Sequence, residues 1–213
     1  MDKNINFVIE KRVLRTIENL EKNNMKGYFV QNEEELLGKI QGLIKEGDTV
    51  SVGGSMTLFE TGIIDFLRRG KYNFLDRYKE GLSQDDIKDI YRKSFAADVY
   101  FSSSNALTEE GELYNVDGRG NRVAAMIYGP DKVIVVVGVN KIVKDLDEAI
   151  IRNREWAAPA NARRLNKKTP CAEVGYCMDC NSKDRICSEY VVIRRQMVKD
   201  RIHVIIVNKE LGY

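Results

Sequence analysis

Hydrophobic positions along the chain alternate between a helical and a strand-like spacing. Apolar residues from Ile5 to Leu20 recur every three or four positions, which predicts an amphipathic helix. The β-branched run from Thr49 to Val52 predicts a strand. Residues 133–137 are apolar at every position, as in a strand covered on both faces. Strand–helix alternation of this kind predicts a largely parallel sheet with helices on both faces.

Caps, turns and periodicity predict the remaining elements. Asn32 and Ser83 have the side chains of N-caps, and Pro159 suits the first turn of a short helix. Trp156 closes an amphipathic helix and is expected in the core. The expected strands are 28–30, 72–75, 98–102, 112–116, 132–137, 190–193 and 202–207, and the expected helices are 33–45, 58–67, 84–96, 120–128 and 145–156. No linker interrupts this series, so residues 1–213 are expected to form a single domain.

The composition narrows the class of protein. The chain has 213 residues, of which 43% are hydrophobic and 31% charged, and its formal net charge is +2. These values exclude a disordered chain, and nucleic-acid binders usually carry more positive charge. No run reaches the roughly 18 apolar residues of a membrane span, and the charged N-terminus does not resemble a signal peptide. We therefore expect a cytoplasmic protein with no membrane span and no nucleic-acid partner.

A glycine-rich turn follows one of the predicted strands. Gly53 and Gly54 allow a ligand to approach the backbone, and Ser55 and Thr57 add hydroxyl groups at the start of the next helix. Open α/β sheets bind ligands at this carboxyl end of a strand. The spacing matches neither the dinucleotide nor the P-loop fingerprint, so an anion site or a plain tight turn are the two interpretations. Glu60, further on, is either a favourable charge near the helix start or a general base.

A second polar region precedes the predicted helix at 120–128. Asp117, Asn121 and Arg122 lie within six residues and are separated by two glycines. Glycines permit positive φ, so the three side chains can converge on one point. A hairpin with solvent-facing turns is the alternative interpretation.

The four cysteines lie within seventeen residues in a C-x5-C-x2-C-x6-C pattern. In a reducing compartment this spacing predicts metal ligands rather than disulfides. Four thiolates suit zinc and an iron–sulfur cluster equally well. The ligands would be Cys171, Cys177, Cys180 and Cys187, within an insertion spanning residues 170–188 that we call the cysteine loop.

Positive charge accompanies the cysteines. Residues 152–201 contain twelve Lys or Arg against six Asp or Glu, a net charge of +6 in a chain whose total is +2. A metal centre held by four thiolates carries about −2, so cationic neighbours would stabilise it. A solvated basic helix face at residues 163–168 accounts for part of the excess.

Four stretches together resemble the LUD-domain family of lactate-utilization proteins. They are GGSMTLFETG, ADVYFSSSNALTEEGELYNVDGRGNRVAA, GPDKVIVVVGVNKIV and TPC…GYCMDC…RIC. The resemblance implies a three-layer α/β fold similar to the ribose-5-phosphate isomerase and CoA-transferase superfamily, with a C-terminal cysteine-rich knob. It also implies an anion site lined by Gly53, Gly54, Ser55 and Thr57, with Asn105, Glu110, Asp117 and Asn121 on the opposing side. The convergence of side chains at 117–122 makes Arg122 a further ligand-binding candidate.

Members of that family are linked to oxidation of lactate to pyruvate in iron–sulfur complexes. The resemblance therefore implies a redox-linked subunit that binds a small carboxylate or phosphate and pairs with other lactate-utilization subunits or a second copy of itself. This context favours an iron–sulfur cluster, with zinc as the alternative. Two other functions stay open: an isomerase- or acyl-transferase-type enzyme on a phosphorylated or CoA-linked substrate, with Glu60, Glu110 or Asp117 as acid, base or nucleophile, and a non-catalytic assembly subunit with structural zinc.

Overall fold

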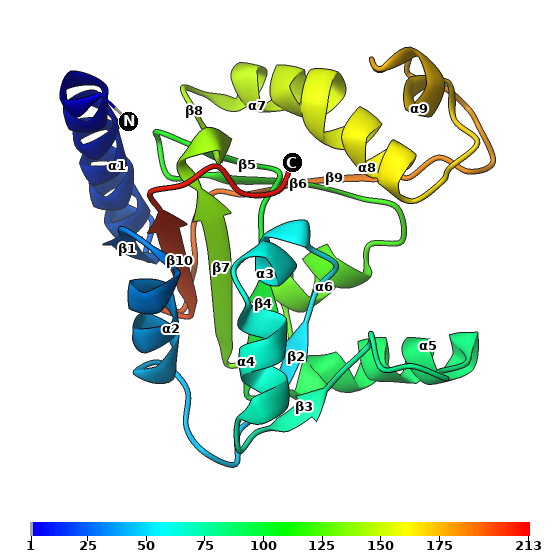
Figure 1. Cartoon of the computed structure of the whole chain (residues 1–213), viewed down its shortest axis with the longest axis horizontal. Coiled ribbons are helices and arrows are strands. Elements are labelled where there is room, and N and C mark those ends of the chain that lie inside the picture. The colour runs from blue at the N-terminus through cyan, green and yellow to red at the C-terminus, as the bar shows by residue number, and fades with distance from the viewer. Residues whose placement is uncertain (1) are drawn as a thin grey trace.

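A computed structural model describes residues 2–213 and contains a six-stranded parallel sheet (Figure 1). Every pairing between neighbouring strands in it is parallel. The predicted three-layer, mostly parallel fold class is therefore confirmed. In spatial order the strands are β1 (Lys26–Val30), β10 (Ile202–Val207), β7 (Lys132–Gly138), β4 (Val99–Ser102), β2 (Thr49–Val52) and β3 (Asn73–Leu75).

Helices cover both faces of this sheet. One face packs α2, α3 and α4 into a buried cluster, and the other packs α1 and α6 together with a second, smaller sheet. In chain order the helices are α1 (Lys3–Lys22), α2 (Glu33–Gln41), α3 (Met56–Glu60), α4 (Ile63–Arg69), α5 (Gln84–Lys93), α6 (Asn121–Ile127), α7 (Leu146–Arg152), α8 (Ala158–Arg164) and α9 (Pro170–Val174). Among the described residues, none of these helices has the length and apolar character to cross a membrane.

The central strand β7 shows why the sheet has two covered faces. Ile134 and Val136 belong to the cluster on one face, whereas Val133, Val135 and Val137 belong to the cluster on the other. All five side chains are fully buried. Alternate side chains of a strand point to opposite faces, so an uninterrupted apolar run satisfies two cores at once.

The second sheet was not expected from the sequence. It has the order β8 (Ile142–Val143), β5 (Ala106–Thr108), β6 (Leu113–Asp117) and β9 (Glu189–Ile193). β5 and β6 form an antiparallel hairpin, and β9 joins β6 from more than seventy positions further along the chain. β5 and β8 are too short to show a period of two, so only their partners make them strands.

Local signals fixed several helix starts, but two expectations about helices were wrong. Asn32 and Ser83 cap α2 and α5 through their side chains, as predicted. The helix expected over 58–67 is two helices, because Gly62 adopts φ +71° between α3 and α4. Trp156 was expected in the core but is 70% exposed. It lies in a π-helical turn, Asn153–Ala157, whose extra residue rotates the helix face and buries Asn153 and Ala157 instead.

Candidate functional site

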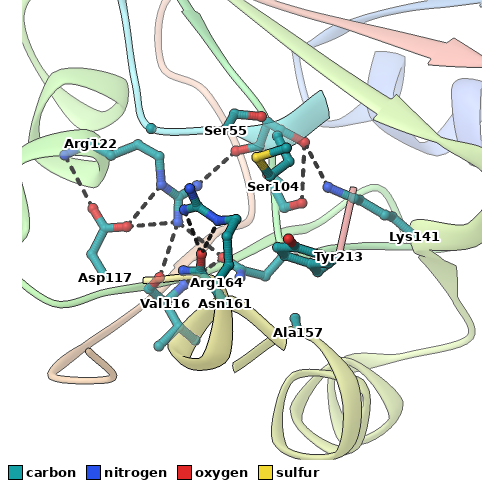
Figure 2. A pocket seen from close by; sticks show the side chains of 14 residues that line it. Ser55, Ser104, Val116, Asp117, Arg122, Lys141, Ala157, Asn161, Arg164 and Tyr213 are labelled. Carbon is teal, nitrogen blue, oxygen red and sulfur yellow. Dashed lines mark hydrogen bonds and ion pairs between the residues drawn. The ribbon is translucent and has the colours of Figure 1, made fainter. Parts of the chain in front are cut away.

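A pocket of about 100 Å³ lies at the carboxyl ends of β2 and β4. Its walls come from the β2–α3 turn, the segment after β4, the β6–α6 loop and α8, and it also includes Lys141 and Tyr213 (Figure 2). Segments more than 150 residues apart in sequence therefore meet at one edge of the sheet. This is the edge at which ligands bind in open parallel sheets.

Lys141 is the most unusual group in this pocket. Its side chain is 3% exposed, and its Nζ donates to Thr57 Oγ1 at 3.0 Å and Ser103 Oγ at 3.1 Å. Among the described residues no carboxylate lies within ion-pair distance of this amine. Burial, reinforced by the nearby Arg152 and Arg122, lowers the pKa of Lys141 to about 7. The pocket therefore holds a buried amine that changes charge near neutrality and is partnered only by hydroxyl groups.

The segment 211–213 covers Lys141 from one side. Gly212 N–H donates to Glu60 Oε2 at 2.7 Å, so the Glu60 carboxylate is bound to the backbone of this segment. The position of a Cβ on Gly212 would lie 2.7 Å from Thr57 Oγ1 and 3.3 Å from Lys141 Nζ. Only a glycine fits here, and its φ of +55° is also one that glycine adopts easily. Glu60 thus affects Lys141 through its charge, not through a contact.

Arg122 holds the opposite side of the pocket together (Figure 2). Its guanidinium is almost fully buried and forms an ion pair with Asp117 at 2.8 Å. Asp117 also accepts the backbone N–H groups of Arg122 and Val123, so it fixes the start of α6. The five N–H groups of the guanidinium donate to Asp117 Oδ1 (2.8 Å), Ser103 O (2.7 Å), Asn115 Oδ1 (2.7 Å), Asn105 Oδ1 (3.0 Å) and Val116 O (3.2 Å).

This network changes what Arg122 can do for a ligand. Each donor of the guanidinium already has a protein acceptor, so the group supplies positive charge and rigidity rather than free hydrogen bonds. The Oδ1 of Asn105 is also engaged, because it accepts from Arg122 and from Val116 N–H. The sequence predicted that Asp117 and Arg122 converge. It did not predict that every N–H group of Arg122 has an acceptor within the protein.

The residues of the glycine-rich turn have divided roles in the structure. Gly54 and Ser55 line the pocket, whereas Thr57 is buried behind it and reaches it through Lys141. Gly53 is buried, and a Cβ there would lie 2.9 Å from Arg122 Cγ. Its absence of a side chain therefore makes room for the Arg122 network rather than for a ligand.

The structure does not bring two of the proposed acids into the pocket. Glu60 is exposed and held by Gly212, and Glu110 lies in the turn between β5 and β6, where its carboxylate is 3.8 Å from Arg194. The neighbouring Glu109 pairs with Arg12 and Arg15, so this turn lies against α1 rather than over the pocket. Of the three candidate acids, only Asp117 lines the pocket. Asn121 lies beside it, in a wider groove outside the pocket.

Sequence reasoning missed Lys141. A signal for it was present, because Lys141 comes three residues after the doubly buried strand β7 ends. Polar residues at the carboxyl end of a central parallel strand point to the ligand edge of the sheet. The sequence did not show that this lysine is buried, since the residues that cover it lie at positions 57, 103 and 212.

The four cysteines line one small cavity of about 20 Å³. All four are free thiols and partly buried, and burial together with the neighbouring thiols raises the pKa of Cys187 to about 11. Asp179 N–H donates to Cys177 Sγ at 3.4 Å across the C-x2-C turn, and the Arg185 side chain donates to the backbone carbonyls of Cys180 and Cys187. These hydrogen bonds hold the backbone of the loop in a conformation in which all four thiols line the same cavity.

Four cysteine sulfurs are the type of ligand that zinc and iron–sulfur clusters bind. Four sulfur donors around one cavity, with an N–H directed at one of them, match the chemistry of zinc and iron–sulfur sites. Within residues 2–213, however, no three Cys, His, Asp or Glu side chains stand in metal-binding arrangement. The metal at the cysteine loop therefore stays a prediction.

Comparisons with known proteins place the chain in a family. The family model of the LUD domain matches residues 13–207, while no curated protein matches. A solved structure of a DUF162 family protein from Deinococcus radiodurans is similar with a TM-score of 0.53 and 15% identity, covering 93% of this chain and 98% of that one. The eIF2B beta and eIF2B delta structures from Chaetomium thermophilum have TM-scores of 0.37 and 0.38 at 15% and 20% identity, covering 55% and 68% of this chain and 44% and 55% of theirs. The chain belongs to the LUD domain family.

Proposed function

We propose that this protein binds a small carboxylate metabolite, such as lactate or pyruvate, in the Lys141 pocket and acts in organic-acid utilization. The observation that carries the proposal is the buried Lys141 amine, which has hydroxyl partners but no carboxylate partner among the described residues. A buried cation without a counter-ion is unfavourable, and an anionic ligand relieves that cost. Membership of the LUD domain family is consistent with lactate as the metabolite.

Charge and size support a small acid. Arg152 lies beside the pocket and donates to the backbone carbonyls Asn140 O and Asn105 O. It forms no ion pair with a carboxylate among the described residues. Positive charge from Lys141 and Arg152 thus exceeds the negative charge of Glu60, since Asp117 is neutralised by Arg122. A cavity of about 100 Å³ is well below the ~300–1,000 Å³ of sites for drug-sized ligands.

The test is ligand-dependent thermal stabilisation with lactate, pyruvate and glycolate. Lys141→Met should weaken carboxylate binding 10- to 100-fold, because a charge-assisted hydrogen bond contributes about 1.5–3 kcal/mol. Lys144→Met removes the same charge from an exposed site and should bind as the wild type does. A wild type that responds to none of the three acids, or a Lys141→Met variant that responds equally, would contradict the proposal.

The second candidate function is an isomerase- or acyl-transferase-type enzyme that uses the same pocket. A lysine with a pKa near 7 has both protonation states available at neutral pH, which suits general acid–base work. Turnover of sugar phosphates or acyl-CoA esters without an electron acceptor would favour that reaction class. Loss of turnover in Lys141→Met, with binding of the phosphorylated substrate retained, would assign the proton transfer to Lys141.

A metal at the cysteine loop is the second part of the proposal. The supporting observation is that the four thiols line one cavity, with the backbone N–H of Asp179 on Cys177 Sγ. An iron–sulfur cluster there would carry electrons for a redox-linked subunit, and zinc would hold the loop in shape. Metal analysis and a visible spectrum of anaerobically purified protein separate them. Iron with sulfide and broad visible absorbance identifies an iron–sulfur cluster. Stoichiometric zinc without colour identifies a structural zinc site. A protein that contains neither iron nor zinc contradicts a metal at the cysteine loop.

A further inference from the structure

A groove of about 590 Å³ continues outward from the Lys141 pocket. The two share Gly54, Ser55, Asp117, Arg122 and Arg164 among their lining residues. The groove runs between the β3–α5 connection on one side and the cysteine loop on the other. A ligand in the groove would therefore have one end at the mouth of the pocket.

The groove is strongly cationic. Its lining contains seven basic side chains and only two acidic ones. Asp117 is neutralised by Arg122, and Asp184 accepts the backbone N–H of Lys168. Five of the basic groups form no ion pair with any described residue: Arg77, Arg119, Arg164, Lys167 and Lys183. Such an uncompensated cluster, held by four separate segments of the chain, is a site for more than one negative charge.

An aromatic surface lies at the inner side of this groove. Phe59 and Tyr78 pack edge to face at 4.7 Å between ring centroids, and Arg77 lies over the rings of Tyr78 and Tyr91 at 5.3 and 4.6 Å. The Arg77 guanidinium is thereby held against aromatic rings, with no carboxylate paired to it among its described neighbours. Planar rings and stacked guanidinium groups accept a planar base on their faces.

We propose that the groove binds an organic polyphosphate that carries a planar base, as in a nucleoside diphosphate or coenzyme A. The proposal rests on the proposed function in one respect, namely that a separate small acid occupies the Lys141 pocket. Arg119, Lys167 and Lys183 contact the phosphates, and the Arg77–Tyr91 stack contacts the base. The volume of the groove falls in the range of sites for ligands of this size.

The arrangement favours a polyphosphate over the other anions. A single carboxylate would leave most of the five unpaired cations uncompensated, whereas a diphosphate carries several negative charges over a short length. Arginine side chains suit phosphate oxygens because their planar fork donates two parallel hydrogen bonds. A single-stranded nucleic acid offers the same groups, and it is therefore an outcome of the test.

The experiment measures binding of pyrophosphate, adenosine, ADP and coenzyme A to the full chain by calorimetry at two salt concentrations. ADP and coenzyme A should bind at least tenfold more tightly than adenosine, and pyrophosphate should bind more weakly than ADP. The double variant Arg119→Gln/Lys167→Gln should weaken ADP binding at least tenfold. A matched control, Arg195→Gln/Lys199→Gln, removes the same charge from the β9–β10 loop, outside the groove, and should bind as the wild type does.

Several results would overturn the proposal. They are the absence of saturable binding of ADP, coenzyme A and pyrophosphate, equal losses in the double variant and its control, and tighter binding of an oligonucleotide than of either nucleotide. Neither double variant touches Lys141, so lactate binding is measured on the same samples. In the wild type, lactate binding without any ADP, coenzyme A or pyrophosphate binding counts against the groove alone. ADP binding without any carboxylate response counts against the proposed function alone.

Discussion

The Lys141 pocket takes its walls from six separate segments, whereas the cysteine loop takes all four thiols from one stretch of seventeen residues. Around the pocket, Arg122 and Asp117 are buried and joined by short hydrogen bonds to neighbouring strands and loops. Around the thiols there is one five-residue helix, α9, and the cysteines are only partly buried. Packing of the whole domain thus preorganises the pocket, while the cysteine loop has little buried structure of its own.

The two regions nevertheless share a border. Arg185 and Ile186 line both the thiol cavity and the cationic groove. Ser188 N–H donates to Asp117 O at 2.8 Å, and a Cβ on Gly118 would lie 3.2 Å from Ile186 Cα. The cysteine loop therefore packs directly on the segment that carries Asp117. Order gained in the loop on metal binding would stiffen one wall of the groove.

The largest effect is expected from Cys177→Ser. It should reduce bound metal to background and make residues 165–190 sensitive to proteolysis, because metal binding free energy is folding free energy for such a loop. Metal analysis and limited proteolysis check this. Met178→Ser, an exposed position between two of the cysteines, should keep its metal. Full metal content in Cys177→Ser would show that Cys177 is not a ligand and would contradict the four-cysteine site. Altered lactate binding would show that the two regions are coupled across their border.

Arg122→Met is the corresponding change on the side of the pocket. It leaves Asp117 buried without its partner, so the free energy of unfolding should fall by about 3–5 kcal/mol, measured by urea denaturation. Arg119→Met, three residues earlier and exposed, should change it by less than about 0.5 kcal/mol. The metal content of both variants should equal that of the wild type. Equal stabilities of the two variants would mean that the Arg122 network does not hold the pocket.

The pH dependence of the pocket should have two slopes of opposite sign. The pKa of Lys141 is about 7 in the folded chain, below its ordinary value of 10.5, so between these values the unfolded chain binds more protons. The contribution of this group to the free energy of unfolding therefore rises with pH over that window in the absence of ligand. Carboxylate affinity should instead fall as pH rises through about 7, because the amine loses its charge.

Denaturation and ligand titrations from about pH 6 to 9, which bracket the folded-state pKa, check both slopes. Lys141→Met should lack both, since it has no group that titrates at this position. A wild-type carboxylate affinity that stays constant over this range would rule out Lys141 as the group that binds the anion.

Only a small effect on the fold is expected from Gly54→Val. A Cβ at Gly54 meets nothing closer than Arg77 Nη1 at 3.5 Å, so the free energy of unfolding should stay within about 1 kcal/mol of the wild type. The added side chain occupies the entrance shared by the pocket and the groove, and both lactate and ADP should bind at least tenfold more weakly. Gly38→Val, on α2 with open space around it, is the control. Unchanged binding of lactate and ADP in Gly54→Val would show that Gly53 and Gly54 form only a tight turn and take no part in ligand binding.

The sequence predicted the main sheet well because its signals are local. The apolar run of β7 indicated a strand with two covered faces, and the caps at Asn32 and Ser83 marked helix starts. The glycine-rich turn was correctly placed at a strand end, and Gly54 and Ser55 line the pocket there. The second sheet escaped prediction because β5 and β8 have only three and two residues, and because β6 pairs with β9 from a distant part of the chain.

Residue types and spacing by themselves determined the strand–helix order, the family motifs and the grouping of the four cysteines, since each of these is written within a few consecutive residues. Tertiary structure alone decided that Lys141 is buried against Thr57 and Ser103, and that the donors of Arg122 are all satisfied. It also decided that Glu110 lies away from the pocket. The reason is physical: burial, pKa and hydrogen-bond satisfaction depend on atoms supplied by distant segments, and a local pattern carries no record of them.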